Sequence, residues 1–172
     1  MRYTMRLVVL IVAALCLMIP SALAQEAAAP GVCAQAMLPA IPFMPYAGDE
    51  GALSDGQQLF AEGKYAEAAP YLEVETDDAL SVYCLGEMYL SGLGVQQDEA
   101  YAKELLMQAI RGENTLAMLR LGTLYEYGVY VEENLNEAAV WYVEALYFGN
   151  EDASAYIEAV EEKMIAMGID HR

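Results

Sequence analysis

The chain has 172 residues, 57% of them hydrophobic, and its 26 acidic and 8 basic side chains give a formal net charge of -18. A surface this acidic repels nucleic acid and anionic lipid, so we exclude both as ligands. Basic proteins and divalent cations remain compatible with this charge, and solubility alone would also explain it.

The first 24 residues are typical of a secretory signal peptide. Two arginines lie in residues 1–6, an unbroken apolar run covers residues 7–19, and small residues at 22–24 suit cleavage before Gln25. The apolar run is shorter than a membrane-spanning helix requires. We therefore expect an exported protein, periplasmic or secreted, with no membrane insertion after the signal is cleaved.

Residues 25–53 form a distinct segment that is rich in proline and alanine. Its four prolines prevent a continuous helix, so we expect an extended segment with one short helical turn near residues 34–38. The stretch 41–46 is unusually apolar for a linker, and we expect it to lie against the helices that follow.

Two cysteines remain after signal cleavage, Cys33 and Cys84. An oxidising compartment favours a disulfide between them, and closing a loop of about 52 residues would contribute about 4 kcal/mol. Cys84 occupies the repeat position of Arg120, a residue type that is rarely buried, so we predict that Cys84 faces solvent. The alternative is two free thiols, one of them packed as a small hydrophobic side chain.

From Ser54 onward the apolar residues follow a helical period, and turn and capping residues divide the helices. Two short helices are predicted at 57–62 and 65–75, the second containing Pro70. The next helix begins after Asp77 or Asp78 and runs to about Ser91. Each later helix is predicted to begin at a capping residue. Asp98 begins a helix that ends at Arg111, and Asn114 begins one that ends at Tyr127. Asn134 or Asn136 begins a helix that ends before Gly149, and Asp152 begins the last helix.

A repeat with an offset of 36 residues runs through the helical region. An offset of this size marks a pair of short helices that buries its apolar face against a neighbouring pair. Gly86 and Gly122 lie inside helices, where glycine is unfavourable, so we expect another helix to approach closely there. The repeated positions are Leu85/Leu121, Gly86/Gly122, Tyr89/Tyr125, Gly92/Gly128, Val95/Val131, Ala102/Ala138 and Ala109/Ala145.

This pattern resembles the Sel-1-like repeat family, a relative of the tetratricopeptide repeat. The resemblance covers residues 54–167 and includes Trp141, while the first unit is more similar to a tetratricopeptide unit. It implies an all-α fold, a right-handed α/α solenoid of about three helix-pair repeats, closed by a C-terminal capping helix whose apolar stripe is Ala153, Tyr156, Ile157, Val160, Met164 and Met167. Residues 168–172 form a tail.

The third unit departs from the second in its loop. Tyr130 replaces Gly94 and Asn134 replaces Asp98, so we expect a differently shaped loop there. In the second unit, Leu105 replaces the tryptophan.

The sequence contains no pattern of catalytic residues, and we predict neither a cofactor nor a metal site. The single histidine, His171, is next to the C-terminus. The acidic stretch at 132–137 lacks the alternating ligands and the turn glycine of a calcium loop, so we interpret it as a solvated face. A β-lactam or cell-wall hydrolase is a remote alternative, because the chain has no Ser-x-x-Lys motif.

The resemblance implies that the first helix of each pair lines a concave face that binds protein. Aromatic and apolar side chains there suit a docked peptide or helix. An alternative is that these side chains pack beneath residues 25–53. The candidate partner-binding residues are Tyr83, Cys84, Glu87, Leu119, Arg120, Thr123 and Tyr127.

We therefore hypothesise an exported interaction module, or scaffold, that binds a partner protein or peptide and has no enzymatic activity. The second hypothesis is a structural subunit of an envelope assembly that contacts its partners through residues 25–53. Neither the partner nor the oligomeric state follows from the sequence.

Overall fold

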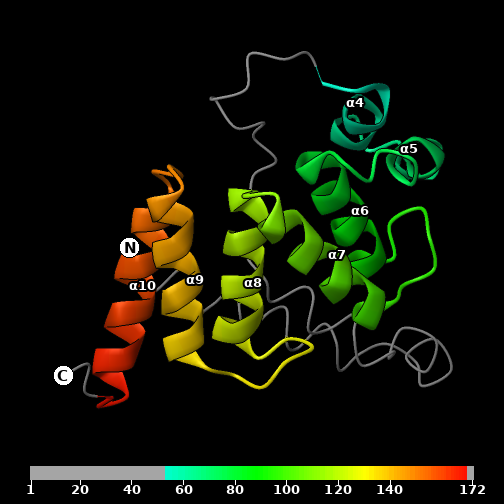
Figure 1. Ribbon diagram of the computed structural model, residues 1–172. Coiled ribbons are helices and arrows are strands. Elements are labelled where there is room, and N and C mark those ends of the chain that lie inside the picture. Colours follow the sequence, from blue (N-terminus) through cyan, green and yellow to red (C-terminus); the bar gives the residue numbers. More distant parts are fainter. Residues whose placement is uncertain (1–52, 170–172) are drawn as a thin grey trace, which may run out of the picture. The chain divides into compact units, whose positions relative to one another are not determined.

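The computed structural model describes residues 53–169, and in this range it contains seven α-helices and no strand (Figure 1). The predicted signal peptide, the 25–53 segment up to residue 52, and residues 170–172 lie outside the described residues. The helices are α4 (Asp55–Ala61), α5 (Tyr65–Leu72), α6 (Ala79–Ser91), α7 (Glu99–Arg111), α8 (Thr115–Tyr127), α9 (Leu135–Tyr147) and α10 (Ala153–Ala166).

Consecutive helices pack as antiparallel pairs, α4 with α5, α6 with α7, and α8 with α9, and α10 then packs against α9 (Figure 1). Neighbouring pairs meet where α5 contacts α6 and where α7 contacts α8. The prediction of an all-α fold built from stacked helix pairs and a terminal helix is therefore confirmed.

Short polar side chains set the beginning of four helices. The side chains of Asp78, Asp98, Asn114 and Asn134 each accept a hydrogen bond from a backbone N–H in the first turn of α6, α7, α8 and α9. These caps were among those predicted. Asp152 precedes α10, but its own backbone is already helical and its side chain accepts no such bond, so the cap predicted there is wrong.

Two predicted boundaries change. Helix α4 begins at Asp55, two residues earlier than expected, because Ser54 and Gln57 form a capping box. Helix α5 ends at Leu72 rather than at Glu75. Pro70 lies within α5, two residues before its end, and its ring nitrogen provides no hydrogen for the helical bond to the fourth residue before it.

The loop of the third unit has the same backbone form as that of the second, contrary to prediction. Gly92 and Gly128 have φ of 64° and 63°, and Gly94 and Tyr130 have φ of 70° and 60°. Tyr130 thus adopts a left-handed conformation that favours glycine. Its hydroxyl accepts a hydrogen bond of 2.9 Å from the side chain of Gln97 in the preceding loop.

Small residues allow the paired helices to approach closely, as predicted. A Cβ added at Gly122 would collide with the ring of Tyr142, and one at Gly86 would lie 3.3 Å from Leu106 Cδ2. Tyr142 and Leu106 occupy the same repeat position, 36 residues apart. The four repeated alanines, Ala102, Ala109, Ala138 and Ala145, are completely buried.

Helix α10 buries a narrower stripe than predicted. Ala153, Val160 and Met164 are buried, while Tyr156 and Ile157 are partly exposed. Met167 follows the end of the helix and is exposed. The terminal helix therefore covers the end of the third pair with three buried side chains and with two partly exposed ones, Tyr156 and Ile157.

Candidate functional site

Most of the predicted partner-binding residues lie inside the protein. Tyr83 and Leu119 are buried, and so are Glu87, Arg120 and Thr123, whereas Tyr127 is exposed. The first helices α6 and α8 carry these residues, and residues 81–88 and 115–124 are buried without a gap. The structure therefore brings the predicted residues together as a buried cluster, and it corrects the prediction that they form an open binding face.

Glu87 and Arg120 form the centre of this cluster. Arg120 Nε and Nη2 donate hydrogen bonds of 2.6 Å to Glu87 Oε1 and Oε2, a two-bond pair between α6 and α8. Burial would lower the pKa of Arg120, but the charge and hydrogen bonds of Glu87 outweigh it and raise that pKa. Burial also raises the pKa of the neighbouring Tyr83 hydroxyl well above its usual value. The pair joins adjacent repeats and leaves neither charge for a ligand.

Cys84 is completely buried, so the predicted exposure of this position is wrong. Arginine is usually exposed, yet Arg120 at the corresponding repeat position is only 7% exposed because Glu87 compensates its charge. Burial, with Glu87 nearby, raises the pKa of the Cys84 thiol. Cys84 is a free thiol in the structure, and Cys33 lies outside the described residues, so the disulfide between them remains a prediction.

A second group of polar contacts joins α8, α9 and α10, and its Tyr142–Glu126 bond is buried. The Tyr142 hydroxyl donates to Glu126 Oε2 at 2.8 Å, and burial, followed by this bond, raises the pKa of Tyr142. Lys163 Nζ donates to the backbone oxygen of Glu126 at 2.7 Å and pairs with Glu133 at 3.3 Å. The same ammonium lies over the ring of Tyr127, 5.2 Å from its centre.

A third group of polar contacts joins the first helix pair, α4–α5, to the second, α6–α7. The side chain of Gln57 donates to Asp78 Oδ2 at 2.6 Å and to Ser81 Oγ at 2.9 Å. The hydroxyls of Ser54 and Ser81 both donate to Glu75 Oε2, at 2.7 and 2.5 Å. These polar side chains fix α4 against the start of α6, so their role is structural.

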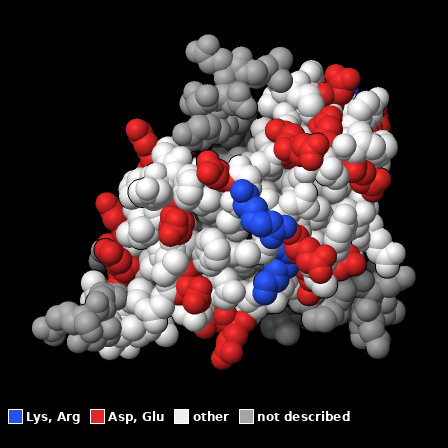
Figure 2. Space-filling view, in the orientation of Figure 1, with Lys and Arg blue, Asp and Glu red and all other residues white. Residues whose placement is uncertain are grey.

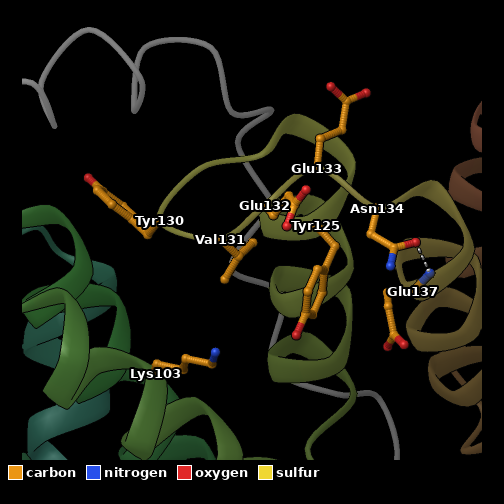
Figure 3. A pocket seen from close by; sticks show the side chains of 8 residues that line it. All are labelled: Lys103, Tyr125, Tyr130, Val131, Glu132, Glu133, Asn134 and Glu137. Carbon is orange, nitrogen blue, oxygen red and sulfur yellow. Dashed lines mark hydrogen bonds between the residues drawn. The ribbon is translucent and has the colours of Figure 1, made fainter.

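A pocket lies between α7 and the loop that connects α8 to α9 (Figure 3). Lys103 extends into it from α7, and Tyr125 faces it from α8, while Glu133 points away (Figure 3). Among residues 53–169 no three histidine, cysteine or acidic side chains come together as metal ligands. The lining residues are Lys103, Tyr125, Tyr130, Val131, Glu132, Glu133, Asn134 and Glu137.

The surface carries far more acidic than basic side chains. Figure 2 shows Asp and Glu spread over the visible face and most of the visible Lys and Arg in one group near its centre. In the described range, no helix combines the length and the apolar character needed to cross a bilayer. In the described part, the charged side chains that remain exposed are thus mainly acidic, and several apolar side chains are exposed as well.

The repeats identified in the sequence and their geometry agree with a known family. Residues 79–114 and 115–147 each match the family model of the Sel1 repeat. The chain therefore contains two Sel1 repeats. The two Sel1 repeats coincide with the pairs α6–α7 and α8–α9, whereas the α4–α5 pair lies outside the matched residues. No solved structure matches the chain.

Sel1 repeats are protein–protein interaction modules. In this chain the Sel1 repeat positions account for the small and buried residues, but they leave the outer side of each second helix unconstrained. The exposed apolar residues of α9, among them Val140, Val143 and Tyr147, do not belong to the first helices and were not predicted. A comparison of α9 with α7 at the 36-residue offset would have revealed them, because α7 has charged residues at two of these three positions.

Proposed function

We propose that this chain is an exported Sel1-repeat module that binds a partner protein and catalyses no reaction itself. The observation that carries the proposal is the pair of stacked Sel1 repeats, whose buried charges and hydroxyls pair with one another rather than with an open site. The proposal of export is supported by the charged, apolar and small-residue pattern of residues 1–24.

The proposed partner meets side chains that remain exposed. Of the seven residues predicted for a concave-face contact, only Tyr127 is exposed. A binding surface on the first helices would therefore have to centre on Tyr127. The strongly acidic surface favours a partner with complementary basic residues, since opposite potentials speed association and exclude wrong partners.

The proposal is tested by expressing the full chain in a bacterial host and following both export and binding. We expect periplasmic or secreted protein whose first residue is Gln25, as measured by N-terminal sequencing. Chemical cross-linking in the cells that produce the protein is expected to give one discrete adduct with another protein. A chain that keeps Met1 and stays inside the cell would contradict export, and the absence of an adduct would contradict binding.

The alternative, a structural subunit that binds through its N-terminal segment, is favoured by the apolar residues at 41–46. Deleting residues 25–51 after the signal distinguishes the two. Loss of the cross-linked partner on deletion would support the alternative, whereas a partner retained by the helical domain would support our proposal. Binding of labelled penicillin to the purified protein would instead revive the hydrolase hypothesis.

A further inference from the structure

Helix α9 carries an apolar stripe on the side opposite to its buried face. Val140, Val143 and Tyr147 are 54%, 51% and 81% exposed, while the buried side chains of α9 are Leu135, Ala138, Tyr142 and Ala145. The three stripe residues are spaced three and four positions apart, so they lie in one row along the helix. This spacing is the one through which helices pack against each other side by side.

The stacking of repeats does not require this stripe, as the second repeat shows. At an offset of 36 residues, Val140 corresponds to Glu104 and Tyr147 to Arg111, and both of these charged residues are exposed on α7. Only Val143 has an apolar counterpart, Met107. The same position in the fold is therefore charged on α7 and apolar on α9, which indicates that α9 has a role in addition to stacking.

Acidic side chains border the stripe along one edge. Glu137 is three residues before Val140, and Glu144 is three residues before Tyr147, so both carboxylates lie beside the row; both are exposed. No ion pair joins either of them to another of the described residues. Leu146 borders the opposite edge and is also exposed. A ligand complementary to this surface needs an apolar ridge with positive charges along one side.

We propose that the stripe of α9 is a docking site for a basic amphipathic helix of a partner protein, an assignment that rests on the proposed binding function and names the chemistry of the partner. The partner helix lays its apolar side chains along Val140, Val143 and Tyr147. Its lysines or arginines pair with Glu137 and Glu144. Aromatic side chains commonly carry much of the binding energy of such contacts, so we expect Tyr147, the aromatic and most exposed residue of the three, to contribute most.

Charge complementarity favours a different protein over a second copy of this chain. With a net charge of -18, two copies repel each other. None of the helices α4 to α10 has more than two basic residues, so the described part of this chain supplies no suitable ligand helix. The first 52 residues contain two basic residues, both within the predicted signal peptide, and are equally unsuitable in composition.

The test uses the full chain and two synthetic peptides. Each peptide has about three heptads with leucine at the core positions, and the remaining positions are lysine in one peptide and glutamate in the other. Trp141, the only tryptophan of the chain, lies beside Val140 on α9 and reports binding through its fluorescence. We expect the lysine peptide to bind and to change this fluorescence, and the glutamate peptide to bind at least about tenfold more weakly.

The decisive variant is V140E/Y147R, which gives α9 the residues that α7 carries at the same positions. It leaves the net charge unchanged, and exposed positions tolerate it without loss of the fold, which a circular dichroism melt verifies. We expect its affinity for the lysine peptide to fall at least about tenfold. The control V74E/I165R makes a matched pair of changes at two other exposed apolar residues and is expected to bind as the unchanged protein does.

Three results would overturn the assignment. Equal binding of the lysine peptide to V140E/Y147R and to the unchanged chain would show that the stripe is not the site. Equal binding of both peptides would remove the charge argument. A dimer in sedimentation that V140E/Y147R dissociates would make the stripe a self-interface. In each case the proposed function survives if the intact protein still cross-links to a different partner in cells, and it fails if no partner is captured.

Discussion

The ion pair between Glu87 and Arg120 joins two repeats through charges that water scarcely reaches. Both carboxylate oxygens accept a hydrogen bond of 2.6 Å, so the desolvation of the two charges is offset by their mutual attraction and by good geometry. The pair acts as a fixed link between α6 and α8 rather than as a site for a ligand.

Replacing Glu87 by leucine is expected to destabilise the protein by about 3–5 kcal/mol, because it leaves the guanidinium of Arg120 buried without its counter-charge. Urea unfolding followed by circular dichroism measures the loss. The double variant E87L/R120M removes both charges and is expected to recover most of it. A single variant as stable as the unchanged chain would show that Arg120 finds water or another acceptor.

Two glycines at one repeat position are expected to respond differently to alanine. Gly122→Ala places a methyl group against the ring of Tyr142, which is itself held by Glu126, and should destabilise the protein by about 1–3 kcal/mol. In Gly86→Ala the new methyl group lies 3.3 Å from the flexible end of Leu106 and in ordinary contact, 3.5 Å, with Leu105 Cβ. The helix-propensity gain of about 1 kcal/mol should therefore leave this variant as stable as the unchanged protein or more stable. Thermal unfolding of both variants measures these changes in stability. Equal changes in melting temperature would contradict the difference in packing.

At the scale of the elements, the two loops after α6 and α8 share one backbone path but differ in what surrounds them. Gly94 packs against the first turn of α5, where a Cβ would collide with the backbone of Ala66. Tyr130 occupies the corresponding place in the next loop with a left-handed backbone and a bond from Gln97. The backbone conformation of the loop therefore follows from the repeat, while the helix pair packed against the loop determines which residue fits at this position.

Gly94→Ala is expected to cost substantially more stability than Gly63→Ala, although the φ values are nearly equal, 70° and 74°. Both substitutions incur the left-handed penalty of about 1–2 kcal/mol. Gly63 has no heavy atom within 4 Å of an added Cβ, so its variant incurs only that penalty, whereas Gly94→Ala adds a collision with backbone worth about 1–3 kcal/mol. Urea unfolding of the two variants measures the difference, and similar losses would show that α5 can move away.

The sequence predicted those elements whose causes are local. The caps at Asp78, Asp98 and Asn114 depend on residues within one turn, and the glycine and alanine positions recur at a fixed offset. The buried state of Arg120 could not be predicted in this way, because it depends on Glu87, 33 residues earlier and in another repeat. A residue type's usual exposure fails where a distant partner compensates its charge.

At the scale of the whole molecule, excess negative charge opposes folding. With 26 acidic against 8 basic side chains, repulsion within the folded chain is strongest at low ionic strength. We therefore expect the melting temperature to rise by several degrees between about 0.01 and 0.5 M sodium chloride, since screening weakens repulsion more than it weakens the buried Glu87–Arg120 pair. Differential scanning calorimetry measures the shift, and a melting temperature that falls with salt would show that surface ion pairs outweigh the repulsion.

The same acidic surface and the apolar stripe on α9 connect the fold to the proposed function. The helix pairs position α9, and the stripe of Val140, Val143 and Tyr147 on its outer side distinguishes it from α7. This difference is present in the sequence, but the repeat pattern predicts only the positions that recur between units and not those that differ between them.

Site-specific photo-cross-linking in the cells that produce the protein tests the central claim most directly. A photoreactive residue at position 140 of the full chain is expected to capture one partner protein through a basic helical segment identified by mass spectrometry, and Y147R introduced beside it should abolish the adduct. A photoreactive residue at Val74 is the control and is expected to capture nothing specific. No adduct from position 140, or the same adducts from both positions, would contradict the account.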